Sequence, residues 1–411
     1  MQAEHEFDVI VVGAGPIGAA TARHLTALGA DVLIVGPDEP ARFDDHDGVW
    51  AGHYDQGRLA HVLEVPLVSS LLANRSIRRF PALYENTGIE FAKPTPSLAV
   101  MPEAITDPES AEWFDRDRLV GNAADLGVGV VRLDEADLRQ RYRHLSFEPG
   151  HVGVLQPDAF IVNPRELVRA LLGVATRGGA TLIRDEITDI RREARGQRVT
   201  AYSGLSWRAR SVVVATGAAT NAIELLGRPL AMDAFGATVV LVEAPEPDEV
   251  DLPATMYLKV RDGETLYGGI VMPPLRYPDG RWYFKCAGNS VLETPLDTPD
   301  EIARWVRSGG NQKDIDEAHS VLTDLMPRQQ FGAAHTRPCL VSANRTALPY
   351  IDQIDDDLFV AVEGERGVMA ADEIGRLTAE LASTGRWSDS IPHDLLRAVW
   401  EIPLATESPV R

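Results

Sequence analysis

The stretch from residue 7 to residue 35 constrains the fold of this chain more than any other. It begins with the apolar, β-branched run FDVIVVG and continues at once into GAGPIG. Gly13, Gly15 and Gly18 therefore stand in the spacing G-x-G-x-x-G. A helical segment over residues 19–28 and a second apolar run, DVLIVG, follow. Strand, glycine turn, helix and strand at these distances predict the βαβ unit of a dinucleotide-binding fold.

Each glycine of this turn has a separate physical role. Gly13 permits the tight turn, Gly15 lets the backbone approach a pyrophosphate, and Gly18 lets helix and strand pack closely. The diphosphate is expected at the helix N-terminus, where free N–H groups and the helix dipole favour negative charge. Pro16 and Ile17, which lie between these glycines, belong to the same predicted site.

One expected residue of this unit is missing. The second strand of such a fold ends in an acidic residue that binds the adenosine ribose. That position is Gly36 here, and Pro37, Asp38 and Glu39 follow it. Asp38 or Glu39 reaches back to the ribose, or backbone groups and water replace the acid. The departure argues against free NAD and favours a cofactor with many other contacts.

Length and charge restrict the class of protein. A chain of 411 residues with 45% hydrophobic and 25% charged residues predicts a globular protein of two domains. A net charge of −21 argues against binding to nucleic acid or to anionic membranes. No apolar run approaches the ~18 residues of a membrane span, and the acidic N-terminus does not resemble a signal peptide. Two cysteines provide neither a disulfide framework nor a zinc site. We expect a cytoplasmic protein without a metal.

Hydrophobic periodicity gives a coarse order of elements. Residues 49–64 are expected to join a helical stretch that runs to about Phe80, and a helix is expected from about Thr220. Further helical patterns cover residues 108–126, 134–142, 298–308 and 312–325. Alternating apolar residues with Pro, Gly and Asp turns predict strands over much of residues 229–335. The pattern indicates an α/β (α+β) chain with a β-rich middle.

The order of these pieces resembles the D-amino-acid oxidase and sarcosine oxidase superfamily of FAD enzymes. The resemblance rests on GAGPIG, the later VVVATGAATN, the β-rich middle, TRPC and a final strand, glycine turn and helix. It implies a discontinuous, Rossmann-like FAD-binding domain over residues 1–80, 150–228 and 335–411. A β-rich substrate domain would comprise residues 81–149 and 229–334. The resemblance also assigns Ile187, Thr216 and Gly217 to the flavin site.

Two stretches resemble active-site segments of the family. GHYDQGR lies where relatives have a polar loop between flavin and substrate, which makes His53, Tyr54 and Arg58 candidates. The alternative is an ordinary polar surface loop. RWYFKCAG resembles the strand whose lysine lies near flavin N5, and Lys285 occupies that place. An ammonium there stabilises the negative charge that develops as O2 is reduced. The alternative is a surface lysine, but the chain has only four lysines.

The segment TRPCLVSANRTALPYID combines two patterns of the family. Arg337 resembles the arginine that binds the substrate carboxylate, and a guanidinium is suited to bidentate carboxylate binding. Cys339 precedes Asp352 by thirteen residues, the spacing of the cysteine that carries covalent flavin in monomeric sarcosine oxidases. Cys339 either forms this link as a thiolate or is a buried, small apolar residue.

The segment EGERGVMAADEIG resembles the last flavin loop. Gly364 and Gly367 would bring the backbone close to the flavin, and Val368 and Met369 would begin the helix that points at it. The sequence also departs from sarcosine oxidases, because His61 replaces an arginine, Met369 a lysine and Asn289 a histidine. Sarcosine is therefore not the expected substrate. Either Arg337 binds a carboxylate, or the substrate has none.

Three functions follow from the resemblance. The first is an FAD-dependent oxidase of a small amine or amino acid, in which hydride passes from the substrate α-carbon to flavin N5 and O2 then accepts the electrons to give H2O2. The second is a dehydrogenase or biosynthetic desaturase with another electron acceptor. The third is an FAD-binding scaffold subunit without chemistry, which would need neither Lys285 nor Arg337. The fold alone does not choose among them, and the oligomeric state stays open.

Overall fold

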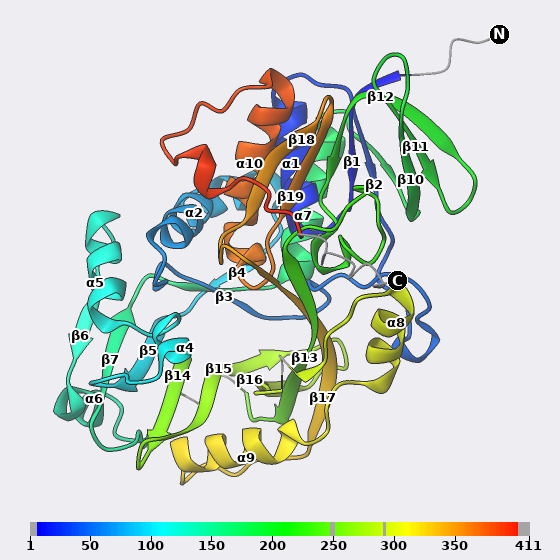
Figure 1. Cartoon of the computed structure of the whole chain (residues 1–411). Helices are drawn as coiled ribbons and strands as arrows, with labels where there is room; N and C mark the ends of the chain where they lie inside the picture. The colour runs from blue at the N-terminus through cyan, green and yellow to red at the C-terminus, as the bar shows by residue number, and fades with distance from the viewer. Residues whose placement is uncertain (1–5, 247–250, 291–292, 402–411) are drawn as a thin grey trace, which may run out of the picture.

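A computed structural model of the chain describes residues 6–246, 251–290 and 293–401. It is a mixed α/β structure with two large sheets, one above the other in the view of Figure 1. The predicted α/β (α+β) fold class is confirmed.

The upper sheet carries the predicted βαβ unit at its centre. Strand β1 (Glu6–Val12) pairs in parallel with β2 (Val32–Val35) and with β12 (Ser206–Val214), so it is covered on both edges. The order is β10-β11-β12-β1-β2-β9, and β19 pairs with both β12 and β18. The remaining strands are β9 (Thr181–Ile183), β10 (Ile187–Arg192), β11 (Gln197–Ala201), β18 (Tyr350–Asp355) and β19 (Leu358–Val362).

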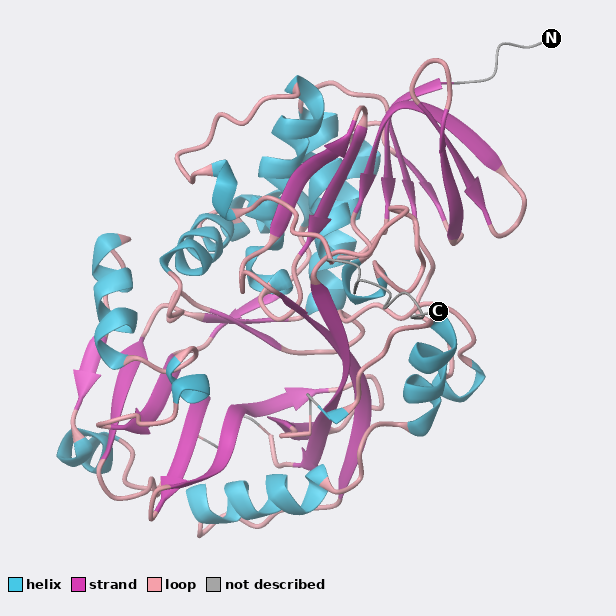
Figure 2. Ribbon diagram, viewed as in Figure 1, coloured by secondary structure: helices cyan, strands magenta, loops and turns pink. Residues whose placement is uncertain are grey.

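Three helices from distant parts of the chain pack together beside this sheet (Figure 2). They are α1 (Pro16–Ala27), α7 (Pro164–Arg177) and α10 (Gly367–Thr384). Small side chains allow α1 and α10 to approach closely, since a Cβ on Gly375 would lie 2.5 Å from the Cβ of Ala20. The first and the last helical segments of the fold therefore share one apolar core.

The lower sheet has the order β17-β13-β16-β15-β14-β5-β7-β6. Its longest pairing joins β13 (Met232–Glu243) to β17 (Ala334–Asn344), which together run from this sheet toward the upper one (Figure 1). Helix α9 (Asp314–Leu325) covers the face turned away from the upper sheet. The other strands are β5 (Ser97–Pro102), β6 (Val131–Leu133), β7 (His151–Gln156), β14 (Ala254–Arg261), β15 (Glu264–Arg276) and β16 (Trp282–Ala287).

A small sheet between the two corrects one prediction. The stretch expected as helix over residues 49–64 is a loop followed by strand β3, which pairs with β8. The helix begins only after Pro66, with α2. This sheet consists of β3 (Arg58–Ala60), β8 (Phe160–Val162) and β4 (Ala92–Pro94). Pairing with a strand about a hundred residues away prevailed over local helical periodicity.

The remaining helices, apart from α3, lie in stretches predicted as helical and have shorter bounds. They are α2 (Leu67–Ile77), α3 (Phe80–Thr87), α4 (Pro108–Ala111), α5 (Arg116–Asp125), α6 (Glu135–Arg141) and α8 (Pro299–Ser308), with 3-10 turns η1 (Phe43–Asp45), η2 (Gly217–Ala219) and η5 (His393–Leu395). The helix expected from Thr220 is wrong, because only turns follow η2 before β13. Within the described residues, no helix is long and apolar enough to cross a membrane. The cytoplasmic location stays a prediction.

The division into domains also stays a prediction, and two strands cross it. Strand β7 and nearly all of β17 lie in ranges that the sequence assigned to the FAD-binding domain, yet both pair in the lower sheet. Strand β17 continues along β13 up to Asn344, which pairs with Met232. The two long strands therefore connect the sheets physically.

Candidate active site

The glycine turn has the geometry that its spacing predicts. Gly13 has φ +110°, and a Cβ there would collide with the carbonyl oxygen of Ala215. A Cβ on Gly18 would collide with the carbonyl oxygen of Gly13. Gly15 is different, since the nearest atom to its ideal Cβ is Nδ1 of His53 at 3.7 Å. Gly13 and Gly18 are thus required by the fold itself, whereas Gly15 leaves space for a ligand.

A large open cleft begins at this turn and contains about 1150 Å³ of space free of atoms. It is lined by the glycine turn, by residues 49–54, by the 215–219 turn, by strand β17 and by the loop before α10. Two buried polar atoms in its wall, Nδ1 of His53 and Oγ of Ser342, have no hydrogen-bond partner among the described residues. The cleft therefore offers both space and unsatisfied polar groups to a ligand.

The end of β2 explains the absent ribose acid. A Cβ on Gly36 would lie 2.5 Å from the backbone nitrogen of Ala14, so no side chain fits there. Asp38 is exposed and ion-paired with Arg184 at 2.9 Å. Glu39 accepts a hydrogen bond from Nε of Arg165 at 2.7 Å. Neither carboxylate lines the cleft in this structure, so its role toward a ribose stays a prediction.

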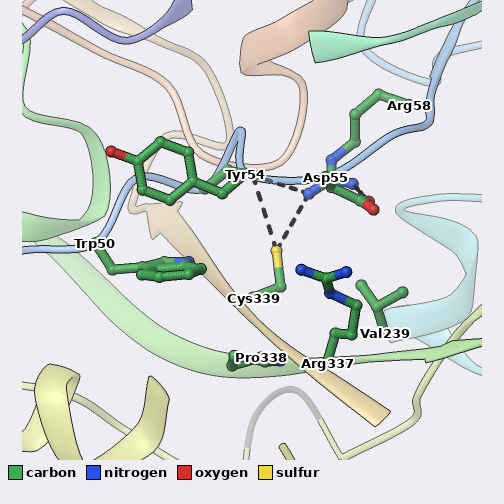
Figure 3. A pocket seen from close by; sticks show the side chains of 9 residues that line it. Trp50, Tyr54, Asp55, Arg58, Val239, Arg337, Pro338 and Cys339 are labelled. Atoms are coloured by element: carbon green, nitrogen blue, oxygen red, sulfur yellow. Dashed lines mark hydrogen bonds and ion pairs between the residues drawn. The ribbon is translucent and has the colours of Figure 1, made fainter. Parts of the chain in front are cut away.

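A smaller cavity adjoins the cleft, and Figure 3 shows its lining side chains. Trp50, Gly52, Tyr54, Arg58 and Cys339 line both spaces. Strand register brings the charged groups here, since residues directly opposite each other in a sheet face the same side. Arg337 lies opposite Val239 on β13, and Lys285 of β16 lies opposite Leu241, two residues further along β13.

Asp55, which the sequence analysis did not select, lies at the centre of these charges. Its Oδ2 accepts hydrogen bonds from Nζ of Lys285 at 2.6 Å and from Arg58, and its Oδ1 accepts one from the hydroxyl of Tyr277 at 2.7 Å. Burial opposes ionisation, but Lys285 and Arg58 hold the pKa of Asp55 well below its usual range. The group is an ionised, buried counter-ion.

Arg337 has a different environment. Its guanidinium lies 4.8 Å from the ring centre of Phe43 and 5.8 Å from that of Tyr277, and it points into the small cavity (Figure 3). Among the described residues, no carboxylate is ion-paired with it. Aromatic faces orient a guanidinium without neutralising its charge. Arg337 therefore presents a positive charge to the cavity.

The thiol of Cys339 lies where both spaces meet. Its Sγ is 3.2 Å from a guanidinium nitrogen of Arg58, and its carbonyl accepts a hydrogen bond from the indole of Trp305 at 3.0 Å. Cys339 and Cys286 are both free.

The two other residues predicted from the polar loop are neutral groups of the wall. Burial, together with the positive charges of Arg165 and Arg58, lowers the pKa of His53 to about 3. Burial raises the pKa of Tyr54. Both side chains are therefore uncharged near neutral pH and offer hydrogen bonds rather than charge.

The loop before α10 closes the other side of the cleft. A Cβ on Gly364 would collide with the carbonyl oxygen of Ser342, so this glycine is required by packing against β17. Gly367 and Val368 line the cleft at the N-terminus of α10, whereas Met369 is buried in the core. Burial raises the pKa of Glu365, another lining residue, to about 7.

The predicted residues thus fall into two groups. Most of them line the large cleft: Gly13, Gly15, Pro16, Ile17, His53, Tyr54, Arg58, Thr216, Gly217, Cys339, Gly364, Gly367 and Val368. Gly18 does not line it and instead packs against the turn. Arg337 lines the small cavity, and Lys285 is bonded to its wall. Ile187 instead packs in the apolar cluster of the upper sheet. Tyr257 and Tyr267 lie away from both spaces, because they are buried on the α9 side of the lower sheet.

A family model decides the class of protein. The model of the FAD dependent oxidoreductase family, DAO, matches residues 8–381. This chain belongs to that family. The match covers the glycine turn, both cavities and most of α10, so the resemblance inferred from the sequence is confirmed.

Curated and solved relatives agree with this assignment. A monomeric sarcosine oxidase from Streptomyces avermitilis is 30% identical over 181 residues, which span 43% of this chain and only 42% of that protein. Over 97% of this chain, the fold matches NikD, described as an unusual amino acid oxidase essential for nikkomycin biosynthesis, with 98% of that chain covered, 21% identity and a TM-score of 0.77. L-proline dehydrogenase from P. horikoshii matches 96% of this chain and 97% of its own with 16% identity and a TM-score of 0.70.

The large cleft fits FAD, the cofactor of this family. The diphosphate would lie against the N-terminus of α1, where Gly15 leaves room and backbone N–H groups point outward. His53 and Ser342 provide the unpaired polar atoms, and the loop at residues 363–368 provides backbone at the opposite wall. When bound, FAD supplies the redox chemistry of the family.

Proposed function

We propose that this FAD-dependent oxidoreductase is an oxidase of a small amine or amino acid that carries a carboxylate, with Arg337 as the carboxylate anchor. The observation that carries this proposal is the position of Arg337. Its guanidinium points into a cavity that adjoins the flavin cleft, and no carboxylate of the described residues neutralises it. A planar guanidinium held between two rings is preorganised for bidentate carboxylate binding.

The reaction removes two electrons from the carbon that bears the amine. Bound FAD would take up a hydride from the α-carbon, which would leave an imine for water to hydrolyse, and O2 would finally accept the two electrons with two protons to give H2O2. The chain's own residues supply position and charge rather than a strong base. Arg337 holds the substrate, and Tyr54 offers a hydroxyl at the wall shared by both spaces.

Lys285 is the proposed group for the reaction with O2. Its ammonium is buried, so it is not the surface lysine of the alternative interpretation. One preorganised cation near developing negative charge accelerates a step by about 10²–10³-fold. The role is an inference from the family resemblance of its strand and from this burial.

Cys339 is proposed as the covalent attachment point of the flavin. The support is its place in the wall of the flavin cleft and the Arg58 guanidinium 3.2 Å from its Sγ. The alternative is a non-covalent flavin with Cys339 as a packing residue. Acid precipitation of the purified protein distinguishes the two, because a covalent flavin stays with the pellet and with the peptide that contains Cys339.

One observation favours a dehydrogenase as the second candidate. The Lys285 ammonium is tied to the Asp55 carboxylate, and this pairing reduces the charge available to activate O2. A solved protein of the same fold is named an L-proline dehydrogenase. Photoreduced enzyme mixed with air separates the candidates, since an oxidase returns to the oxidised spectrum within seconds and a dehydrogenase does so far more slowly.

The substrate class is tested by ligand binding and by turnover. Benzoate should perturb the visible flavin spectrum of the wild type and leave that of Arg337→Ala unchanged. A peroxide screen over D- and L-amino acids, cyclic imino acids, N-methyl amino acids and simple amines then identifies the substrate. If an amine without a carboxylate is the best substrate and Arg337→Ala turns it over normally, the proposed anchor is wrong.

A further inference from the structure

Asp55 is the carboxylate around which the polar groups of the small cavity are arranged. Its Oδ2 accepts hydrogen bonds from Lys285 and Arg58, and its Oδ1 accepts one from Tyr277. The side chain is 6% exposed, so protein groups satisfy both oxygens in place of water. Three donors on one buried carboxylate fix its position closely.

Lys285 is positioned by the same loop. Its Nζ donates to Oδ2 of Asp55 at 2.6 Å and to the carbonyl oxygen of Gly57 at 2.5 Å. Lys285 does not itself line either cavity, whereas Asp55 lines the small one. The place of the ammonium is therefore set by two acceptors of the 55–57 segment.

We propose that Asp55 is a positioning residue of the active site, whose carboxylate holds the Lys285 ammonium and the Arg58 guanidinium in place and balances one of their two charges. This inference rests on the proposed role of Lys285 in the reaction of reduced flavin with O2. Asp55 itself neither binds the substrate nor transfers a proton in this scheme, because both of its oxygens are occupied.

The charge around Lys285 predicts how the loss of Asp55 would act. The titratable groups that face Lys285 are Asp55 from the loop, Arg58 at the start of β3 and the thiol of Cys339 from β17. Burial and Arg58 lower the pKa of Lys285, while Asp55 raises it. Without the Asp55 charge the pKa of Lys285 falls further, so the ammonium loses its proton at a lower pH than in the wild type.

The test uses the holoenzyme and needs no substrate. The flavin is photoreduced without oxygen, mixed with O2, and its reoxidation is followed from about pH 6 to about pH 10. The reoxidation rate should fall as pH rises, and in Asp55→Asn the midpoint of this fall should lie at least one pH unit below that of the wild type. At alkaline pH the variant should therefore react about tenfold more slowly than the wild type. At about pH 6, where Lys285 is still protonated, the reoxidation rate of Asp55→Asn should approach that of the wild type.

Two variants show which group titrates. Tyr277→Phe removes one hydrogen bond from Asp55 but leaves its charge, so the pH midpoint should stay at the wild-type value. In the double variant Asp55→Asn/Lys285→Met the displaced transition should disappear. Sulphite binding, read as bleaching of the flavin, gives a second readout without turnover, because a nearby cation favours the anionic adduct. Its pH dependence should move in the same direction.

A fold defect is separated from a charge effect by the apoprotein and by rescue. In apo Asp55→Asn the folded state must bury the Lys285 charge without a partner, so the melting temperature should be lower than that of the wild type. This loss should become smaller as pH rises, because Lys285 then loses its proton in the folded state while it keeps the proton in the unfolded state. Asp55→Ser leaves room for formate beside Lys285, and it carries the test if the Asn variant does not fold. Formate should return its pH profile toward that of the wild type.

The experiments distinguish a failure of the proposed role of Asp55 from a failure of the proposed role of Lys285. A wild-type pH profile in Asp55→Asn, or in Asp55→Ser without formate, would overturn the positioning role and leave Asp55 a structural residue. Unchanged reoxidation in Lys285→Met would instead remove the proposed oxygen step, on which the inference depends.

Discussion

Two clusters of buried charge in this molecule are built in opposite ways. On α10 and in the segment just after it, the carboxylates of Asp372, Glu373, Glu380 and Asp389 are paired with the guanidinium groups of Arg23, Arg75, Arg79 and Arg376. These charges are equal in number and of opposite sign. Around the small cavity, Lys285 and Arg58 share the carboxylate of Asp55, and Arg337 has no carboxylate partner among the described residues.

The difference separates structural charge from functional charge. A balanced network offsets part of the cost of burying each ion, because every charge has a partner, and the loss of one partner leaves another charge buried and unpaired. The cavity cluster retains a surplus of positive charge next to a cleft that fits FAD. This surplus can be balanced by the carboxylate of a bound substrate or by the negative charge that develops as O2 is reduced.

The largest effect is expected from a substitution that breaks the balanced network along α10. Glu373 is fully buried and is bonded to Arg75, Arg79 and Arg376. Glu373→Ala should lower the free energy of unfolding by about 3 kcal/mol, the cost of leaving buried charge unpaired. Denaturant titration measures the loss. Activity per folded, flavin-loaded molecule should not change, and a large loss of activity with normal stability would contradict the structural assignment.

The next effect concerns the cavity cluster. Lys285→Met should slow reoxidation of reduced flavin by O2 by about 10²–10³-fold, as expected for the loss of one preorganised charge. Anaerobic reduction of the flavin by substrate should change much less. Stopped-flow absorbance measures both steps, and equal slowing of the two would mean that Lys285 acts on the site as a whole.

A smaller effect is expected at the unbalanced charge itself. Arg337→Ala should raise KM for a carboxylate substrate by about 10–100-fold, the equivalent of 1.5–3 kcal/mol for a charged hydrogen-bonded contact. Arg337→Lys should restore little, because an ammonium lacks the planar fork. The melting temperature should hold or rise, since the variant removes an uncompensated charge. A melting temperature well below the wild type would place Arg337 with the structural charges.

The smallest effect is the response of the α10 network to acid. Burial alone would raise the pKa of Asp389 and of Asp372. Hydrogen bonds from the Ile391 backbone and from arginines nevertheless lower the pKa of Asp389 to about 2. Interactions with His24, Arg23 and Arg79 lower the pKa of Asp372. These carboxyls have lower pKa values in the folded state than in the unfolded state. Their stabilisation is therefore present above about pH 4 and is lost as the pH falls toward 2. The melting temperature should decline by several degrees over that window, and Glu373→Ala should flatten the decline.

The sequence predicted the parts of the site that depend on local order. The glycine turn is fixed by residues close together in the chain, and alternation along one strand placed Arg337 and Cys339 on the same face. Asp55 and Tyr277 were missed because their contact joins residues 222 positions apart. The one available signal was the acid three residues before Arg58, in the segment already selected. Strand β3 was missed for the same reason, since its partner β8 is distant in sequence.

The close packing of α1 against α10 has a consequence for the making of the protein. The glycine turn leaves the ribosome about 350 residues before the loop at residues 363–368 and α10, which complete the cleft. A nascent chain that ends before residue 363 has the pyrophosphate turn without the opposite wall. Capture of the cofactor must therefore wait until synthesis has passed residue 368, and the Ala20–Gly375 contact joins segments made far apart in time.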